Sequence, residues 1–86
     1  MPGWDFTSVY KAIIQYIDQD LREGDHTLNF GVVALAEGSN RVIVRFTLSN
    51  VRTGWRHRWT TLVQGDTMPA MTAMIRSMVG SKLALE

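Results

Sequence analysis

Residues 41–49 read RVIVRFTLS, in which apolar and polar side chains alternate with a period of two. That period is typical of a half-buried β-strand. The same alternation runs through residues 27–36 before this stretch and through residues 55–64 after it. Short turn sequences, at 37–39 and 51–54, separate the three runs. The sequence therefore predicts three strands joined in an antiparallel meander.

The lengths of the two turns constrain how the strands pair. Inward-facing residues are even-numbered in the first two runs and odd-numbered in the third. Side chains pair across strands only on the same face, so the first loop must hold an odd number of residues and the second an even number. Three residues at 37–39 and four at 51–54 satisfy both conditions. Gly54, the last residue of the second loop, can take a positive φ there.

The resulting register aligns Phe30, Phe46 and Trp59 in one row of the inner face. A register shifted by two residues would instead place Arg45 directly opposite Arg58, and like charges in that position are unfavourable. We therefore predict the first register. Its neighbouring rows hold Val32, Val44 and Thr61 on the inner face, and Val33, Ile43 and Leu62 on the outer face.

Helical periodicity flanks the strands on both sides. Apolar residues recur at spacings of three and four over residues 6–22, which predicts an amphipathic helix there. Asp5 is its expected N-cap, and Gly24 is its expected left-handed C-cap residue. A second stripe with the same spacing predicts a helix over residues 67–79, and it consists of Met68, Met71, Met74, Ile75 and Met78. We interpret this stripe as core packing, and a partner-binding groove or dimer contact is the alternative.

Capping signals bound the second helix. Asp66 or Thr67 is its expected N-cap, Pro69 is tolerated in the first turn, and Gly80 is the expected stop. Each helix has one apolar stripe and the sheet has one strongly apolar face, so both helices should lie on that face. The predicted fold is an α+β domain in two layers, with the order α-β-β-β-α. Its core should contain Ile13, Ile17, Phe30, Phe46, Trp59, Met71 and Ile75.

Composition predicts that residues 1–86 form one small domain. The 45% hydrophobic content is normal for a folded protein, and the lack of cysteine, which fits a reducing compartment, leads us to expect a cytoplasmic location. No apolar run approaches the roughly 20 residues of a membrane span, and residues 1–5 lack the features of a signal peptide, so no membrane partner is expected. Leu85 and Glu86 resemble the start of an expression-tag linker, so we predict no role for them.

No pattern of titratable residues predicts a catalytic or metal site. His26 and His57 lack a second ligand at metal-binding spacing, so we interpret both as structural, with pH sensing as the alternative for His57. The carboxylates at 18–25 lack the spacing of a calcium loop and are typical of a solvated helix end. They are Asp18, Asp20, Glu23 and Asp25. With no activated nucleophile and no phosphate-binding glycine loop, we expect no enzyme activity, cofactor, metal or small-molecule substrate.

The order helix–three strands–helix is similar to that of double-stranded-RNA-binding domains. Those domains carry a lysine cluster at the start of their second helix, where it meets phosphates. The corresponding residues here, 66–71, read DTMPAM and contain an aspartate but no lysine. Because the resemblance stops at topology, no functional residue is carried over from that family.

Basic residues are concentrated in the second and third predicted strands. No acidic residue occurs between Glu37 and Asp66, and residues 51–59 read VRTGWRHRW. Basic residues interleaved with aromatics are typical of nucleic-acid binders. Alternation nevertheless places the tryptophans on the face opposite Arg56 and Arg58, where they cannot stack on bases held by these arginines.

The outer face of the predicted sheet is the candidate site. If both helices cover the inner face, apolar side chains stay exposed on the outer one, and contiguous exposed apolar patches tend to mark interfaces. The preferred hypothesis is a protein–protein contact, by self-association or within a larger complex, through Val33, Leu35, Ile43 and Leu62. The alternative is electrostatic, sequence-independent nucleic-acid binding. It would use Arg41, Arg45, Arg52, Arg56 and Arg58.

Overall fold

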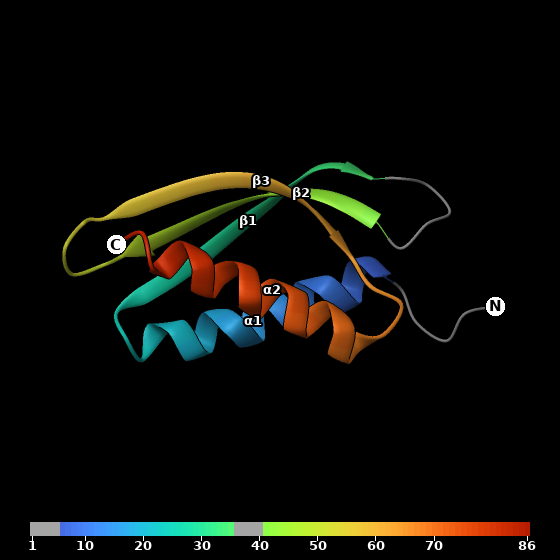
Figure 1. The fold of residues 1–86 in the computed structure, drawn as a ribbon, viewed down its shortest axis with the longest axis horizontal. Helices are drawn as coiled ribbons and strands as arrows, with labels where there is room; N and C mark the ends of the chain where they lie inside the picture. The colour runs from blue at the N-terminus through green and yellow to red at the C-terminus, as the bar shows by residue number, and fades with distance from the viewer. Residues whose placement is uncertain (1–5, 36–40) are drawn as a thin grey trace.

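The computed structural model describes residues 6–35 and 41–86, and its elements follow the predicted order (Figure 1). They are helix α1 (Phe6–Arg22), strands β1 (His26–Leu35), β2 (Arg41–Asn50) and β3 (Arg56–Gln64), and helix α2 (Met68–Leu83). The α+β prediction is therefore confirmed. The predicted N-cap Asp5 and the predicted turn at 37–39 lie outside the described residues.

The sheet has the order β1-β2-β3, and both strand pairs are antiparallel. The predicted inner row is confirmed, because Phe30 pairs with Phe46 and Phe46 pairs with Trp59. Arg45 lies opposite Thr60 rather than opposite Arg58, so the like-charge register is avoided. The turn between β2 and β3 uses Gly54 at a φ of 82°, as its position predicted.

A β-bulge in β1 corrects one predicted row. Val32 still pairs with Val44, but beyond it Ala34 pairs with Ile43 and Leu35 pairs with Val42. Val33 is the extra residue of the bulge. The predicted pairing of Val33 with Ile43 is therefore wrong, whereas the predicted pairing of Ile43 with Leu62 is confirmed. Leu35 was predicted to face outward, but it pairs with Val42, an inner-face residue. A bulge inserts one residue into an edge strand and increases its twist. Four consecutive apolar residues, Val32 to Leu35, carry no alternation that could have revealed the slip.

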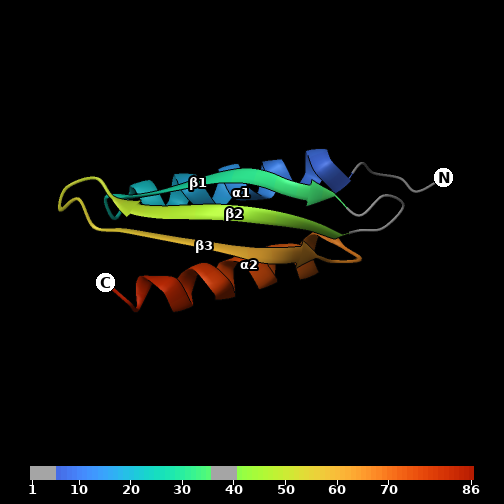
Figure 2. The ribbon, with the colours of Figure 1, turned by 90° about the horizontal axis from the view of Figure 1, so that it is seen from above.

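Both helices lie on one face of the sheet and run in the same direction (Figure 1). Seen from above, α1 lies on the β1 side and α2 lies beside and beyond β3 (Figure 2). The buried core lies between these two layers, and it includes Tyr10, Ile13, Ile14, Ile17, Leu28, Val42, Val44, Phe46, Leu48, Val63, Met71, Ile75 and Val79. Neither of the described helices lies on the opposite face of the sheet.

The predicted core is confirmed for Ile13, Ile17, Phe46, Met71 and Ile75, which are all buried. Phe30 and Trp59 are half-buried and pack against this core from its edges. The methionine stripe is only partly internal, because Met68 at its start is exposed and Met74 and Met78 are half-buried.

Two predicted glycine signals were wrong. Helix α2 does not stop at Gly80 but continues to Leu83, and the added turn packs Leu83 against the core. At the end of α1 the left-handed residue is Asp25, with a φ of 68°, rather than Gly24. Glycine is tolerated inside a helix at a modest cost, so its position alone does not show where the helix ends. The N-cap prediction is confirmed, since Thr67 Oγ1 accepts a hydrogen bond from Ala70 N at 3.2 Å.

Candidate functional site

The open face of the sheet exposes side chains from all three strands. Alternation along β2 and β3 buries one set of residues under the helices and leaves the other set outward. The exposed outward set in these two strands is Arg41, Ile43, Arg45, Arg56, Arg58, Thr60, Leu62 and Gln64. From β1, Asn29, Gly31 and Val33 are exposed.

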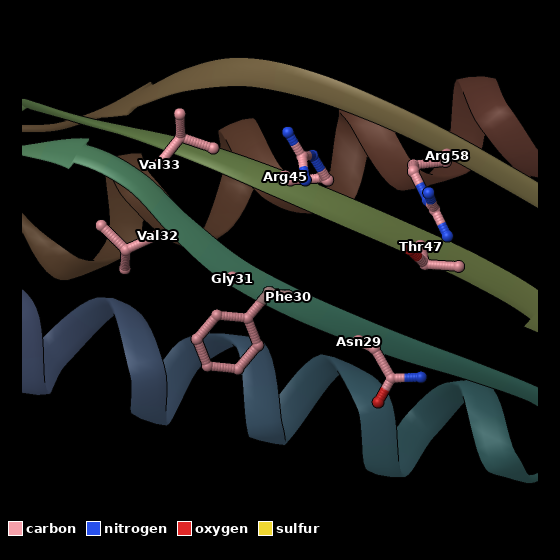
Figure 3. A pocket seen from close by; sticks show the side chains of 8 residues that line it. All are labelled: Asn29, Phe30, Gly31, Val32, Val33, Arg45, Thr47 and Arg58. Atoms are coloured by element: carbon pink, nitrogen blue, oxygen red, sulfur yellow. The ribbon is translucent and has the colours of Figure 1, made fainter.

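Three of these side chains form an apolar patch, which we define as Val33, Ile43 and Leu62. Ile43 and Leu62 are paired across β2 and β3 and are 39% and 43% exposed. Val33 is 50% exposed, and Figure 3 shows it projecting on the same side as Arg45, while its neighbour Val32 points toward the helices. Val33 therefore lies on the open face, although the bulge removes it from pairing with Ile43. Leu35, predicted for the same interface, is displaced from this row by the shifted register.

Four arginines lie on the same face, and we call Arg41, Arg45, Arg56 and Arg58 the outer-face arginines. None of them has an ion pair with any described residue. The three strands contain no aspartate or glutamate, so no carboxylate of the sheet neutralises them. Arg52, the fifth arginine predicted for nucleic-acid contact, lies in the predicted turn after β2, and its Nε is 3.5 Å from an Asp25 carboxylate oxygen.

A shallow hollow of about 340 Å³ opens beside the arginines at the β1 edge (Figure 3). It is lined by Asn29, Phe30, Gly31, Val32, Val33, Arg45, Thr47 and Arg58. Gly31 pairs with Arg45, and in the adjacent row Thr47 lies between Asn29 and Arg58. A Cβ atom added at Gly31 would meet nothing within 4 Å, so the missing side chain leaves open space. Sequence reasoning missed this hollow, because a single glycine in a strand does not reveal what surrounds it.

The aromatic residues of β3 and its neighbours face the helix layer. His57 is stacked between Trp55 and Trp59, with ring centroids 6.3 Å and 5.8 Å away. Trp59 also stacks on Phe46 at 5.3 Å and lies 5.5 Å from Lys82 Nζ. In the described sheet, no aromatic side chain stands among the outer-face arginines, so this face offers no stacking platform for bases.

The sequence led us to expect that Asp18 is part of a solvated helix end. The structure shows instead that its carboxylate is hydrogen-bonded to β1. Its Oδ1 accepts hydrogen bonds from Leu28 N at 2.7 Å and Thr27 Oγ1 at 3.0 Å, and its Oδ2 accepts one from Arg22 Nε at 2.8 Å. Burial alone would raise the pKa of Asp18, but the hydrogen bonds from Leu28, Arg22 and Thr27 outweigh it and lower the pKa. This carboxylate therefore ties α1 to β1.

Asp20 and Asp25 of the same region also take part in ion pairs. Asp20 pairs with Arg76 of α2 at 2.8 Å. Among the described residues, no group of three histidine, cysteine, aspartate or glutamate side chains is arranged to hold a metal ion.

Glu86 takes part in a contact that sequence reasoning did not anticipate. Its Oε1 lies 2.7 Å from His26 Nε2, and its Oε2 accepts a hydrogen bond from Asn50 Nδ2 at 2.8 Å. The hydrogen bonds from His26 and Asn50 hold the pKa of Glu86 below its ordinary value. The Oδ1 of Asn50 also accepts from Arg52 N and Thr53 N, so the β2–β3 turn and residue 86 share one polar cluster.

None of the described helices is long and apolar enough to cross a membrane. We compared the chain with protein-family models, with curated proteins and with solved structures, and none of the three comparisons found a match. The open face of the sheet is therefore assessed on its own chemistry.

Proposed function

We propose that this protein is a small, non-enzymatic interaction or assembly module that contacts another protein chain through the open face of its sheet. One observation carries the proposal: the apolar patch of Val33, Ile43 and Leu62 stands on a sheet face that no described helix covers. Exposed apolar side chains grouped within a polar rim are a feature of protein interfaces. Arginine, which surrounds this patch, is itself enriched at interfaces.

The patch is large enough to contribute to binding. Full burial of a valine, leucine or isoleucine side chain contributes about 1.5–3 kcal/mol. The three side chains are 39–50% exposed, so covering them would contribute on the order of 3 kcal/mol. That is enough to change an affinity by more than a hundredfold and too little to bind alone, so the surrounding polar groups must add to it.

A second candidate function is nucleic-acid binding. The observation that favours it is that the outer-face arginines form no ion pair with any residue in 6–35 or 41–86. Phosphate contacts by arginine would give electrostatic, sequence-independent binding. Such binding falls steeply with salt, with a log–log slope near −0.9 per phosphate contact on duplex DNA. An apolar contact changes far less with salt, so a salt titration separates the two functions.

The test is a pair of measurements on the wild type, Ile43→Asp and Met68→Asp. Sedimentation over a concentration series measures self-association, and selection from a displayed random-peptide library provides ligands for a foreign-partner site. We expect association or peptide binding in the wild type that Ile43→Asp weakens at least tenfold. Met68→Asp is the matched control, because Met68 is similarly exposed but lies at the start of α2.

Two results would contradict the proposal. The first is a strict monomer at high concentration together with a library from which no peptide is enriched. The second is binding that Ile43→Asp leaves unchanged while its amide spectrum stays native. Tight oligonucleotide binding with a steep salt slope, lost in Arg56→Glu/Arg58→Glu, would favour the second candidate instead.

A further inference from the structure

We infer that the hollow beside Gly31 is a subsite for a carboxylate of the bound protein, so the partner that fits this face is an acidic and apolar peptide segment. This inference rests on the proposed function and specifies its partner. Arg45 and Arg58 flank the hollow, and the Arg58 side chain reaches toward Thr47 of β2 (Figure 3). A carboxylate placed there would meet two guanidinium groups and the Thr47 hydroxyl. Guanidinium–carboxylate pairs are among the strongest and most directional polar contacts in proteins.

The glycine at position 31 supports a ligand site independently of the charges. Glycine inside a strand weakens it, and it often marks a place where a ligand approaches the backbone closely. Neither backbone conformation nor close packing requires glycine at position 31: its φ is not positive, and an added Cβ would touch nothing within 4 Å. A side chain would fit at this position, and its absence keeps the hollow open next to Arg45.

The charges of the chain indicate a foreign acidic partner rather than a second copy. Four described carboxylates already have cationic partners or histidine contacts: Asp18, Asp20, Asp25 and Glu86. A second copy would bring its own outer-face arginines against this face, and these four carboxylates would have to leave their present partners to meet them. A partner rich in aspartate or glutamate would neutralise Arg45 and Arg58 without that repulsion.

The position of the apolar patch favours an acidic peptide over nucleic acid. Ile43 and Arg45 are two residues apart on the same face of β2, which corresponds to about 7 Å. An extended peptide with alternating residues offers side chains at that same spacing. A nucleic-acid backbone would satisfy the arginines but would leave Val33, Ile43 and Leu62 against phosphates and sugars.

The experiment titrates isotope-labelled protein with a ten-residue peptide of alternating valine and glutamate. A matched peptide carries glutamine in place of every glutamate, and an oligothymidylate serves as the nucleic-acid probe. We expect the glutamate peptide to shift the Gly31 amide and the Nε–H signals of Arg45 and Arg58. The glutamine peptide should bind at least tenfold more weakly.

Three variants locate the carboxylate. Arg45→Gln/Arg58→Gln and Gly31→Val should each weaken the glutamate peptide at least tenfold, the first by removing charge and the second by filling the hollow. Arg76→Gln is the control for loss of an arginine away from the hollow, because Arg76 lies on α2 and is paired with Asp20. It should change the affinity less than twofold. Native amide spectra confirm that each variant is folded.

The outcomes separate this inference from the proposed function. Equal binding of the two peptides, abolished by Ile43→Asp, would overturn the carboxylate subsite and leave the interaction face intact. Absence of binding by the glutamate peptide would also overturn it. Oligothymidylate binding that is tighter than peptide binding, steeply salt-dependent and lost in Arg45→Gln/Arg58→Gln would show that the arginines serve phosphates instead.

Discussion

Replacing Asp18 with alanine should destabilise the protein by about 2–3 kcal/mol, although the residue looks like part of an ordinary charged helix end. The buried backbone N–H of Leu28 donates to Asp18 Oδ1 at 2.7 Å, and a buried donor left unsatisfied costs about 1–3 kcal/mol. The Arg22 pair is exposed and adds under about 1 kcal/mol. For a domain of this size the melting temperature should fall by about 10–20 °C.

Urea unfolding of three variants tests this reasoning. Asp18→Asn keeps an acceptor oxygen for Leu28 but loses the charge and the acceptor for the exposed Arg22, so we expect a cost of about 1 kcal/mol. Asp20→Ala removes an exposed pair with Arg76 and should cost less than about 1 kcal/mol. If Asp18→Ala costs no more than Asp20→Ala, the hydrogen bond to Leu28 does not tie α1 to β1 as we argue.

The same contact has a pH signature with a defined sign. The folded-state pKa of Asp18 is lowered, so its contribution to stability is fully present above the unfolded-state pKa of about 3.9. That contribution is lost as the pH falls through the lowered folded-state value. The stability difference between the wild type and Asp18→Asn should therefore be constant near neutral pH and shrink in acid. A difference that grows on acidification would contradict the assignment.

Two further substitutions test the backbone of the turn and of α2. Gly54→Ala places a side chain on a residue with a φ of 82°, so we expect the free energy of unfolding in urea to fall by about 1–2 kcal/mol. At Gly31 φ is not positive, so Gly31→Ala should be neutral or stabilising. Equal effects at the two glycines would argue against left-handed strain. Thr67→Ala removes the acceptor for Ala70 N and should lower the stability by about 1 kcal/mol, whereas Thr67→Ser should keep most of that stability. If Thr67→Ser is as destabilising as Thr67→Ala, the hydroxyl is not the cap.

Most of the fold could be predicted from local patterns. The bounds of α1 and the register of the inner row follow from periodicity and loop parity, which are properties of neighbouring residues. The bulge at Val33 could not be predicted, because the apolar run around it fits either face. The end of α2 was missed because the helix continues through Gly80 to Leu83, which packs against the core from another part of the sequence.

The candidate site was predictable only in part. Alternation correctly placed Ile43, Leu62, Arg45 and the arginines of β3 on the open face, since each lies in a strand with a clear period. The hollow at Gly31 exists because glycine has no side chain, and its walls come from all three strands. The shape of the hollow therefore cannot be read from any one stretch of sequence. The contacts of Asp18 with Leu28 and of Glu86 with His26 join residues 10 and 60 positions apart, a separation at which one sequence carries no signal.

An edge strand as long as β1 can pair with a strand of another chain, because its outward N–H and C=O groups have no partner within the sheet. Here the N–H of Leu28 is bonded to Asp18 instead of to a strand, and the bulge at Val33 interrupts the regular spacing farther along. The two features interrupt the edge at two points, which makes it a poorer template for a growing sheet. Straightening the bulge or removing the Asp18 carboxylate should therefore make this edge more prone to fibre formation.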